Sequence, residues 1–313
     1  MTDEVVPAPA KGGRATTWPR RLVVLVPYLW LAAFFLLPFV IVFKLSLSEM
    51  VRAQPPYVPV LDLAEGFEGL QAFFAALSPR NYAFIASDSI YLASYLKSLE
   101  VATIATALLL LIGFPLAYGM ARAPRRLQPL LFMAVVLPFW TAFLIRIYAW
   151  INILQHDGLL NRVLLALHLV SRPVVWLSTD SAMYLGIVYS YLPFMILPLY
   201  ATLVKMEPAL EEAAADLGAS PFQVFWLVTF PLSLPGVAAG VLLCFIPIVG
   251  EFVIPDLLAG SNALMIGQTL WMEFFNNRDW PVASAAAVFL LVLLLAPLLV
   301  YDRLQRRRFE EIK

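Results

Sequence analysis

The chain has 313 residues, of which 62% are hydrophobic and 13% are charged, and its formal net charge is zero. Soluble domains carry about 25% charged residues, so this composition excludes an ordinary water-soluble domain and indicates an integral membrane protein. The neutral charge balance gives no support to a nucleic-acid partner. The single cysteine, Cys244, excludes an internal disulfide.

Uncharged runs of the length that crosses a bilayer recur along the chain. A spanning helix needs about 20 apolar residues, and runs of this length exclude a β-barrel, whose strands are shorter. The predicted spans are Leu22–Phe43, Val101–Ala121, Leu127–Ile145, Ser181–Val204, about 232–255, and Pro281–Tyr301. The fifth begins after Pro231, because prolines interrupt a longer uncharged run. The sequence therefore predicts an all-α membrane protein whose six-helix domain covers residues 22–302.

The charges at the ends of these spans predict the orientation of the chain. Residues 1–21 form a polar tail with no cleavage site after the first span, so we expect this span to be retained. Lysine and arginine are concentrated in this tail, in the 122–128 turn and in the basic tail 303–313. The positive-inside rule then places both termini on the cytoplasmic side of the membrane. The long outer loop 44–93 is expected to hold one or two short interfacial helices.

The cytoplasmic loop 205–231 carries the most local information in the chain. Pro208 suits the first turn of a helix, Gly218 suits a left-handed cap, and Ser220 suits the N-cap of a second helix that ends at Pro231. The first helix carries acidic residues beside a face of alanines, onto which a partner can pack closely. From the pattern alone, an ordinary interfacial loop and a docking surface remain equal alternatives.

This loop is similar to the EAA signature of ABC-importer permeases. The matching residues are Glu212, Ala213, Ala214, Gly218, Val228, Phe230 and Pro231, with Val228 at a position where isoleucine is commoner. The resemblance implies the fold of a type I ABC importer permease, in which this helix-turn-helix docks into a groove of a cytoplasmic ATPase. It also implies that the docking surface is formed by Glu212, Ala213, Ala214, Asp216 and Gly218.

Further segments resemble the permeases of bacterial polyamine importers, in particular the putrescine type, over roughly residues 20–302. They are RAQPPY (52–57), LPFWTAFLIRIYAW (137–150), YLPFM (191–195), GEFVIPDLLAG (250–260) and WMEFFNNRDWPVASA (271–285). The resemblance implies a second permease subunit, two copies of an ATPase and a periplasmic polyamine-binding protein. ATP and magnesium would bind to the ATPase. This chain would hold no cofactor and catalyse no reaction, in agreement with its lack of a GxxxxGK[ST] run.

Ionisable side chains near the outer ends of the spans are candidates for the cargo pathway, since a charge at membrane depth is costly. The carboxylates of Glu100, Glu251 and Asp256 would neutralise the ammonium groups of a polyamine. The rings of Tyr148, Trp150, Trp271 and Tyr191 would attract the same cation, although an interfacial aromatic belt remains an alternative for them. Arg146 would repel the cargo, so we expect it to pair with a carboxylate or to hold the outer gate.

Two other classes of membrane protein have less support in the sequence. A stand-alone secondary transporter should show paired broken helices, and only one Gly/Pro-interrupted region occurs, near 247–260. A membrane enzyme should show a cluster of catalytic or metal-binding residues, whereas the two histidines, His156 and His168, have no third ligand at metal spacing. An ABC permease for another small cationic or organic solute remains the main alternative to a polyamine permease.

Overall fold

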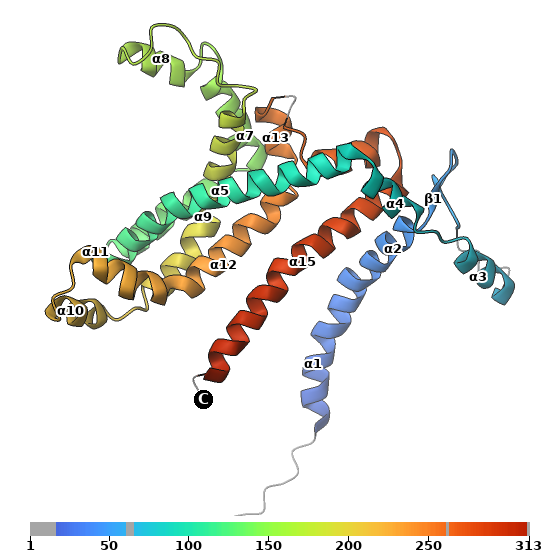
Figure 1. Cartoon of the computed structure of the whole chain (residues 1–313), viewed down its shortest axis with the longest axis horizontal. Helices are drawn as coiled ribbons and strands as arrows, with labels where there is room; N and C mark the ends of the chain where they lie inside the picture. Colours follow the sequence, from blue (N-terminus) through green and yellow to red (C-terminus); the bar gives the residue numbers. More distant parts are fainter. Residues whose placement is uncertain (1–16, 61–65, 261–262, 312–313) are drawn as a thin grey trace, which may run out of the picture.

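The computed structural model describes residues 17–60, 66–260 and 263–311, and these are mostly helical (Figure 1). Most of the predicted N-terminal tail lies outside the described residues. The first half of the chain contains α1 (Thr17–Leu31), a π-turn (Ala32–Leu36), α2 (Leu37–Ser46), β1 (Glu49–Met50), β2 (Tyr57–Val58), α3 (Gly66–Ala75), α4 (Arg80–Ser87), α5 (Ser89–Arg122), α6 (Gln128–Val136), a 3-10 turn (Leu137–Trp140) and α7 (Phe143–Leu154).

The second half continues with helices alone. Its elements are α8 (Leu159–Ala166), α9 (Asp180–Leu203), α10 (Pro208–Asp216), α11 (Pro221–Val224), a π-turn (Phe225–Thr229), α12 (Phe230–Val249), α13 (Val253–Leu258), α14 (Ile266–Trp271), a second π-turn (Met272–Asn276) and α15 (Trp280–Glu311). Helix α15 continues through most of the predicted basic tail. The outer loop predicted to hold one or two short helices contains α3 and α4.

In the part of the chain that the structure describes, four helical segments are long and apolar enough to cross a membrane: Val23–Ser46, Ser89–Arg122, Asp180–Leu203 and Pro221–Val249. A fifth candidate is the pair Gln128–Trp140 and Phe143–Ala166, whose axes differ by 90°. A shorter apolar segment, Trp280–Leu295, begins α15. These segments follow the predicted spans in order along the chain.

The third predicted span, Leu127–Ile145, is not one straight helix. After α6 the chain tightens into a 3-10 turn that contains Pro138, and Thr141 and Ala142 are then extended, with ψ of 146° and 140°. The extended pair ends one helix and starts another in a new direction. The break therefore lies inside the apolar run, and hydropathy alone does not predict it.

The fifth span also differs from its prediction, because the helix runs without interruption from Pro221 to Val249. The π-turn that precedes α12 explains how Pro231 is accommodated. There the Phe230 N–H donates to the Phe225 carbonyl, one residue further back than in an α-helix. Pro231 therefore falls in the first turn of α12, a position where proline is tolerated. The prediction that Pro231 ends a separate helix is wrong.

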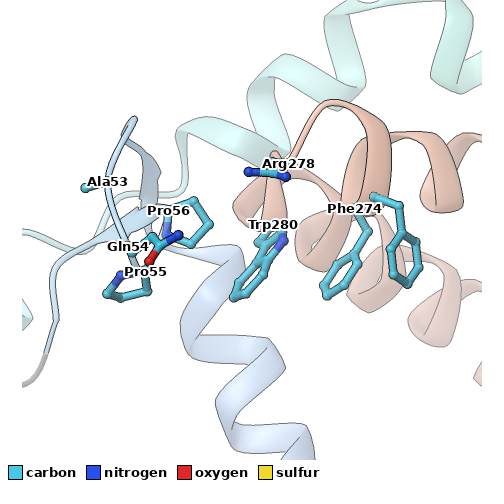
Figure 2. Close-up of a pocket in the computed structure, with 8 residues that line it drawn as sticks. Ala53, Gln54, Pro55, Pro56, Phe274, Arg278 and Trp280 are labelled. Atoms are coloured by element: carbon cyan, nitrogen blue, oxygen red, sulfur yellow. The ribbon is translucent and has the colours of Figure 1, made fainter.

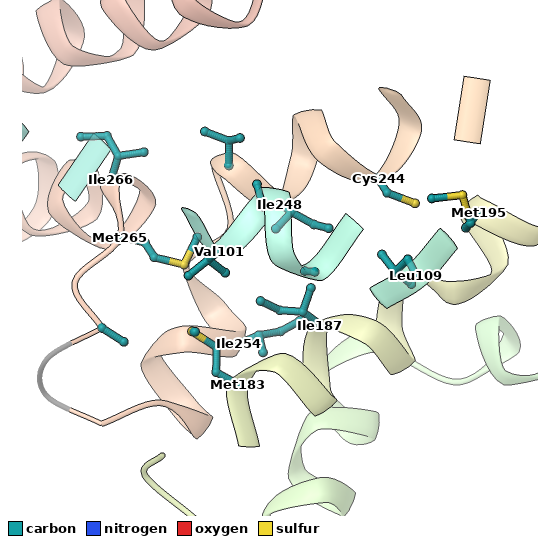
Figure 3. Packing of buried hydrophobic residues seen from close by; sticks show 14 of the residues in the cluster. Val101, Leu109, Met183, Ile187, Met195, Cys244, Ile248, Ile254, Met265 and Ile266 are labelled. Atoms are coloured by element: carbon teal, nitrogen blue, oxygen red, sulfur yellow. The ribbon is translucent and has the colours of Figure 1, made fainter. Parts of the chain in front are cut away.

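Helices α5, α9 and α12 pack together and form the core of the bundle (Figure 3). Fully buried side chains from the three helices meet there, including Val101 and Leu109 of α5, Ile187 and Met195 of α9, and Ile248 of α12. Between helices in a membrane, such packing supplies van der Waals attraction rather than a hydrophobic driving force. The core therefore depends on close fit between these helices.

Gly236 and Gly240, which are spaced as a GxxxG pair, bring α12 into close contact with α9. A Cβ atom on Gly236 would lie 2.6 Å from Thr202 Oγ1 and 2.9 Å from the carbonyl oxygen of Pro198. A Cβ atom on Gly240 would lie 2.7 Å from Met195 Sδ. Both positions are small because the neighbouring helix occupies the space of a side chain.

We expect Gly236→Leu to lower the midpoint of thermal unfolding of the detergent-purified chain. The added side chain has to push α9 away, and overpacking of this kind costs about 1–3 kcal/mol. Gly119→Leu in α5 is the matched control, because a Cβ atom there has no neighbour within 4 Å. Equal midpoints for the two variants would contradict the assigned α9–α12 contact.

Candidate functional site

Helices α10 and α11 lie together at the end of the α5–α9–α12 bundle opposite α4 (Figure 1). Their ends follow the local pattern of the sequence. Pro208 stands in the first turn of α10, and Gly218 has a left-handed φ of 90° directly after the helix. Ser220 and Gln223 form a capping box at the start of α11, in which the Gln223 side chain accepts from the Ser220 N–H at 2.8 Å. The predicted helix-turn-helix is therefore present.

The outer surface of α10 and of the turn after it is exposed. Glu212, Ala213, Asp216 and Gly218 are all exposed, and Ala214 is half-buried. The side chain of Leu217 is 90% exposed. This surface therefore presents an apolar side chain beside carboxylates that have no polar partner among the described residues.

Glu211, which was not among the predicted site residues, is held by two other helical segments. Its carboxylate accepts from Arg122 Nη2 of α5 at 2.7 Å and from Thr229 Oγ1 of the π-turn at 2.7 Å. The side chains of Arg122 and Glu211 are 24% and 17% exposed, and Thr229 is 1% exposed. Glu211 directly precedes the EAA run, and Arg122 directly follows the predicted span Val101–Ala121, but the sequence did not indicate that the two residues pair.

The carboxylate of Glu251 lies at the junction between α12 and α13. Its Oε2 accepts from the Tyr191 hydroxyl of α9 at 2.5 Å, and its Oε1 accepts from the N–H groups of Val253 and Ile254 at 3.0 and 3.4 Å. A Cβ atom on Gly267 would lie 2.8 Å from the Glu251 carbonyl oxygen, so α14 also approaches this junction. The structure thus brings together two of the predicted pathway residues, Tyr191 and Glu251.

The other two predicted carboxylates lie apart from this junction. Glu100 is exposed and accepts from Lys97 Nζ at 3.3 Å within α5. Lys97 also pairs with Asp180 at the start of α9, at 3.5 Å. Asp256 is exposed on α13 and has no recorded side-chain partner in the described part of the chain. Glu100 is therefore already paired with a cation of its own helix. This pair was not among the predictions from the sequence.

The four predicted aromatic residues occupy different surroundings. Trp271 stacks on Phe252, the neighbour of Glu251, with ring centroids 4.9 Å apart and planes 13° apart. Trp150 packs edge-on against Tyr189 at 5.4 Å. Tyr148 on α7 is 54% exposed. Trp271 and Tyr191 thus lie next to the α12–α13 junction, whereas Trp150 and Tyr148 belong to the bent third span.

Arg146 has no carboxylate within ion-pair distance in residues 17–60, 66–260 and 263–311, so the expected pair is not made within this part of the chain. Its guanidinium carbon lies 4.8 Å from the centroid of the Phe139 ring and 5.8 Å from that of Phe143. Its Nε and Nη1 atoms are buried without a hydrogen-bond partner. Two aromatic faces therefore attract the positive charge of Arg146 at the break in the third span. The predicted role of Arg146 in an outer gate remains a prediction.

A cavity of about 580 Å³ opens between the β1–β2 hairpin and the start of α15 (Figure 2). Gln54, Pro55 and Pro56 line one side, and Phe274, Phe275, Arg278 and Trp280 line the other. Both sides come from segments that carry the subfamily resemblance, RAQPPY and WMEFFNNRDWPVASA, which are far apart in the sequence. Nearby, burial raises the pKa of Asp279 above its usual value, although the Val282 N–H bond opposes this shift.

Comparison with protein families gives one match that covers most of the chain. Residues 110–310 match the family described as "Binding-protein-dependent transport system inner membrane component". The matched range includes the helix-turn-helix of α10 and α11 and the junction at Glu251.

Individual relatives and a solved structure extend the similarity. The spermidine/putrescine transport system permease protein PotB of Haemophilus influenzae is 37% identical over 284 residues, which cover 91% of this chain and 93% of the relative. PotB of Escherichia coli is 42% identical over 219 residues, which cover 70% and 80%. A crystal structure of a bacterial ABC transporter that imports the acidic polysaccharide alginate contains a similar chain, with a TM-score of 0.68, 18% identity, and coverage of 93% of this chain and 96% of that one.

Proposed function

Because this chain belongs to the family of binding-protein-dependent transport system inner membrane components, we propose that it carries a polyamine, most specifically putrescine, from the periplasm to the cytoplasm. It has the fold of a type I ABC importer permease, as the sequence predicts. As a member of a family of transport components, it is a transport subunit and not an enzyme. Its partners in our proposal are a second permease, two copies of an ATPase and a periplasmic polyamine-binding protein.

One observation carries the proposed cargo. The similarity to spermidine/putrescine permeases covers 91% of this chain at 37% identity, so it includes the outer segments and not only the region near α10. The alginate importer has the same fold at 18% identity, and the fold therefore does not determine the cargo. The outer segments 52–57 and 271–285, which line one cavity, support a polyamine cargo through their resemblance to polyamine permeases.

The exposed surface of α10 supports the proposed ATPase partner. Glu212, Ala213, Ala214, Asp216 and Gly218 form the docking surface in this proposal. Leu217, at 90% exposure, would be covered by the ATPase on docking. ATP and magnesium bind to the ATPase, and this chain holds no cofactor. Both termini then lie in the cytoplasm, on the same side as α10.

The transport step in this proposal is a change of access between the two sides of the membrane. Closure of the ATPase pair moves α10, and α10 transmits this movement to the spans, so that access alternates between the outer and the inner side of the membrane. Glu251 lies at the break between α12 and α13 and is bonded to α9, so a relative movement of these helices alters its surroundings. Its carboxylate is the group of this chain that we assign to an ammonium end of the cargo.

Uptake of labelled putrescine by proteoliposomes tests the proposal. The vesicles hold this chain with the candidate partners and ATP, and each partner is omitted in turn. We expect uptake that requires ATP and every partner. Uptake without ATP or the ATPase would indicate a secondary transporter. A third outcome is that a loaded binding protein stimulates ATP hydrolysis but neither putrescine nor spermidine is taken up. This outcome would support the role as a permease subunit and contradict a polyamine cargo.

A further inference from the structure

The side chains of α10 make few polar bonds to the rest of the bundle, and all those recorded for the described residues involve one group. That group is the carboxylate of Glu211, which accepts from Arg122 and from Thr229, each at 2.7 Å. The neighbouring acids Glu212 and Asp216 are exposed and make no recorded side-chain bond. A force applied to the exposed surface of α10 therefore reaches the spans through the backbone, through the packing of α10 on α11 and on the π-turn, and through the polar bonds of Glu211.

The two bonds of Glu211 lead to different spans. Arg122 ends α5, which has no direct chain connection to α10, because α6 to α9 lie between them in sequence. Thr229 is the last residue of the π-turn that leads into α12. The carboxylate therefore connects α10 to α5 and α12, two of the three helices that form the core. Its bond to α5 is an ion pair between segments that are not consecutive in the chain.

The surroundings of Arg122 keep this ion pair in one geometry. Its guanidinium carbon lies 5.6 Å from the Tyr118 ring centroid, and Nη2 lies 3.9 Å from Met206 Sδ. Arg122 Nε is buried and has no hydrogen-bond partner among the described residues, so rotation of the guanidinium away from Glu211 would leave further donors unpaired. A charge-assisted bond in such a partly buried site is stronger than an exposed ion pair.

From this geometry we infer that Glu211 is a positioning residue that transmits movement of α10 to α5 and α12. This inference rests on the proposed function, because it assumes that an ATPase moves α10. Glu211 acts through Arg122 and Thr229 and is not assigned a contact with the cargo or with ATP. Loss of its charge should therefore weaken the link between ATP hydrolysis and uptake while the exposed docking surface is preserved.

The test measures putrescine molecules taken up per ATP hydrolysed, with the complete transporter in proteoliposomes. Glu211→Gln keeps the size of the side chain and an acceptor for Thr229 but removes the ion pair. We expect the ratio to fall about fivefold or more, the lower end of typical coupling between sites. Thr229→Val should also lower the ratio. Glu211→Arg combined with Arg122→Glu should recover part of the loss, because it restores an ion pair of reversed polarity.

Glu207→Gln is the matched control, since Glu207 is an exposed acid of the same loop with no recorded side-chain bond within the described residues. The amount of ATPase that co-purifies with each variant reports assembly separately from coupling. The inference is overturned if Glu211→Gln takes up as much putrescine per ATP hydrolysed as the control variant. It is also overturned if the fall in uptake is fully explained by a smaller amount of co-purified ATPase. A wild-type complex without ATP-dependent uptake would overturn the proposed function, and the inference with it.

Discussion

Replacement of Glu251 with lysine is expected to lower putrescine uptake tenfold or more. Lysine has no acceptor, so the Tyr191 hydroxyl and the N–H groups of Val253 and Ile254 would lose the carboxylate to which they donate. A donor left unsatisfied costs about 1–3 kcal/mol, and about 1.4 kcal/mol corresponds to a factor of ten. The added positive charge would also repel an ammonium group of the cargo.

A second variant separates the charge of Glu251 from its hydrogen bonds. Glu251→Gln keeps an oxygen acceptor for the junction between α12 and α13 but removes the negative charge. We expect this variant to assemble normally and still to transport putrescine more slowly than the wild type. Asp157→Asn is the control, because Asp157 is an acid whose side chain is 92% exposed. Wild-type uptake by Glu251→Lys, with the complex intact, would remove Glu251 from the pathway.

Replacement of Gly218 with valine is expected to uncouple ATP hydrolysis from uptake. Gly218 has a φ of 90°, and a Cβ atom added there has no neighbour within 4 Å among the described residues, so the added side chain does not crowd the rest of this chain. The cost comes from the backbone, because left-handed conformations cost a residue with a side chain about 1–2 kcal/mol and are rarest for β-branched residues. A change of this turn would move α10 relative to α11 and so displace the docking surface.

The measurement compares Gly218→Val with Gly218→Asn in the same uptake and ATPase assays. Asparagine adopts the left-handed conformation more readily than other non-glycine residues, and it should therefore keep much of the coupling. Both variants should insert and purify in similar amounts, since the position is exposed. Equal coupling in the two variants would show that the left-handed turn is not needed for docking.

Local sequence patterns predicted the elements that depend on neighbouring residues. Pro208, Gly218 and Ser220 marked the ends of α10 and α11 because proline, glycine and serine have backbone and capping preferences that act within one turn. The GxxxG spacing of Gly236 and Gly240 is likewise a local pattern, and it agrees with the close approach of α12 to α9. Hydropathy located the apolar segments because bilayer thickness sets a minimum length.

Two predictions about the spans were wrong because the prolines in apolar runs are ambiguous. Pro231 was expected to end a helix, yet a π-turn shifts the hydrogen bonds by one residue and the helix continues. Near Pro138 the opposite occurred, because the third span breaks and bends by 90°. The local composition is similar in the two cases. The presence of a proline in an apolar run therefore does not by itself predict whether the helix continues or breaks.

By itself the sequence determined that the chain is a helical membrane protein of the permease class, because composition, span length and the EAA pattern are properties of short segments. Only the tertiary structure decided which charged groups meet. Glu211 joins Arg122 and Thr229, Glu251 joins Tyr191, and Lys97 of α5 joins Asp180 of α9. Most of these partners are far apart in the chain. An ion pair or hydrogen bond needs its atoms within about 3 Å, and that proximity arises only when α5, α9 and α12 pack together.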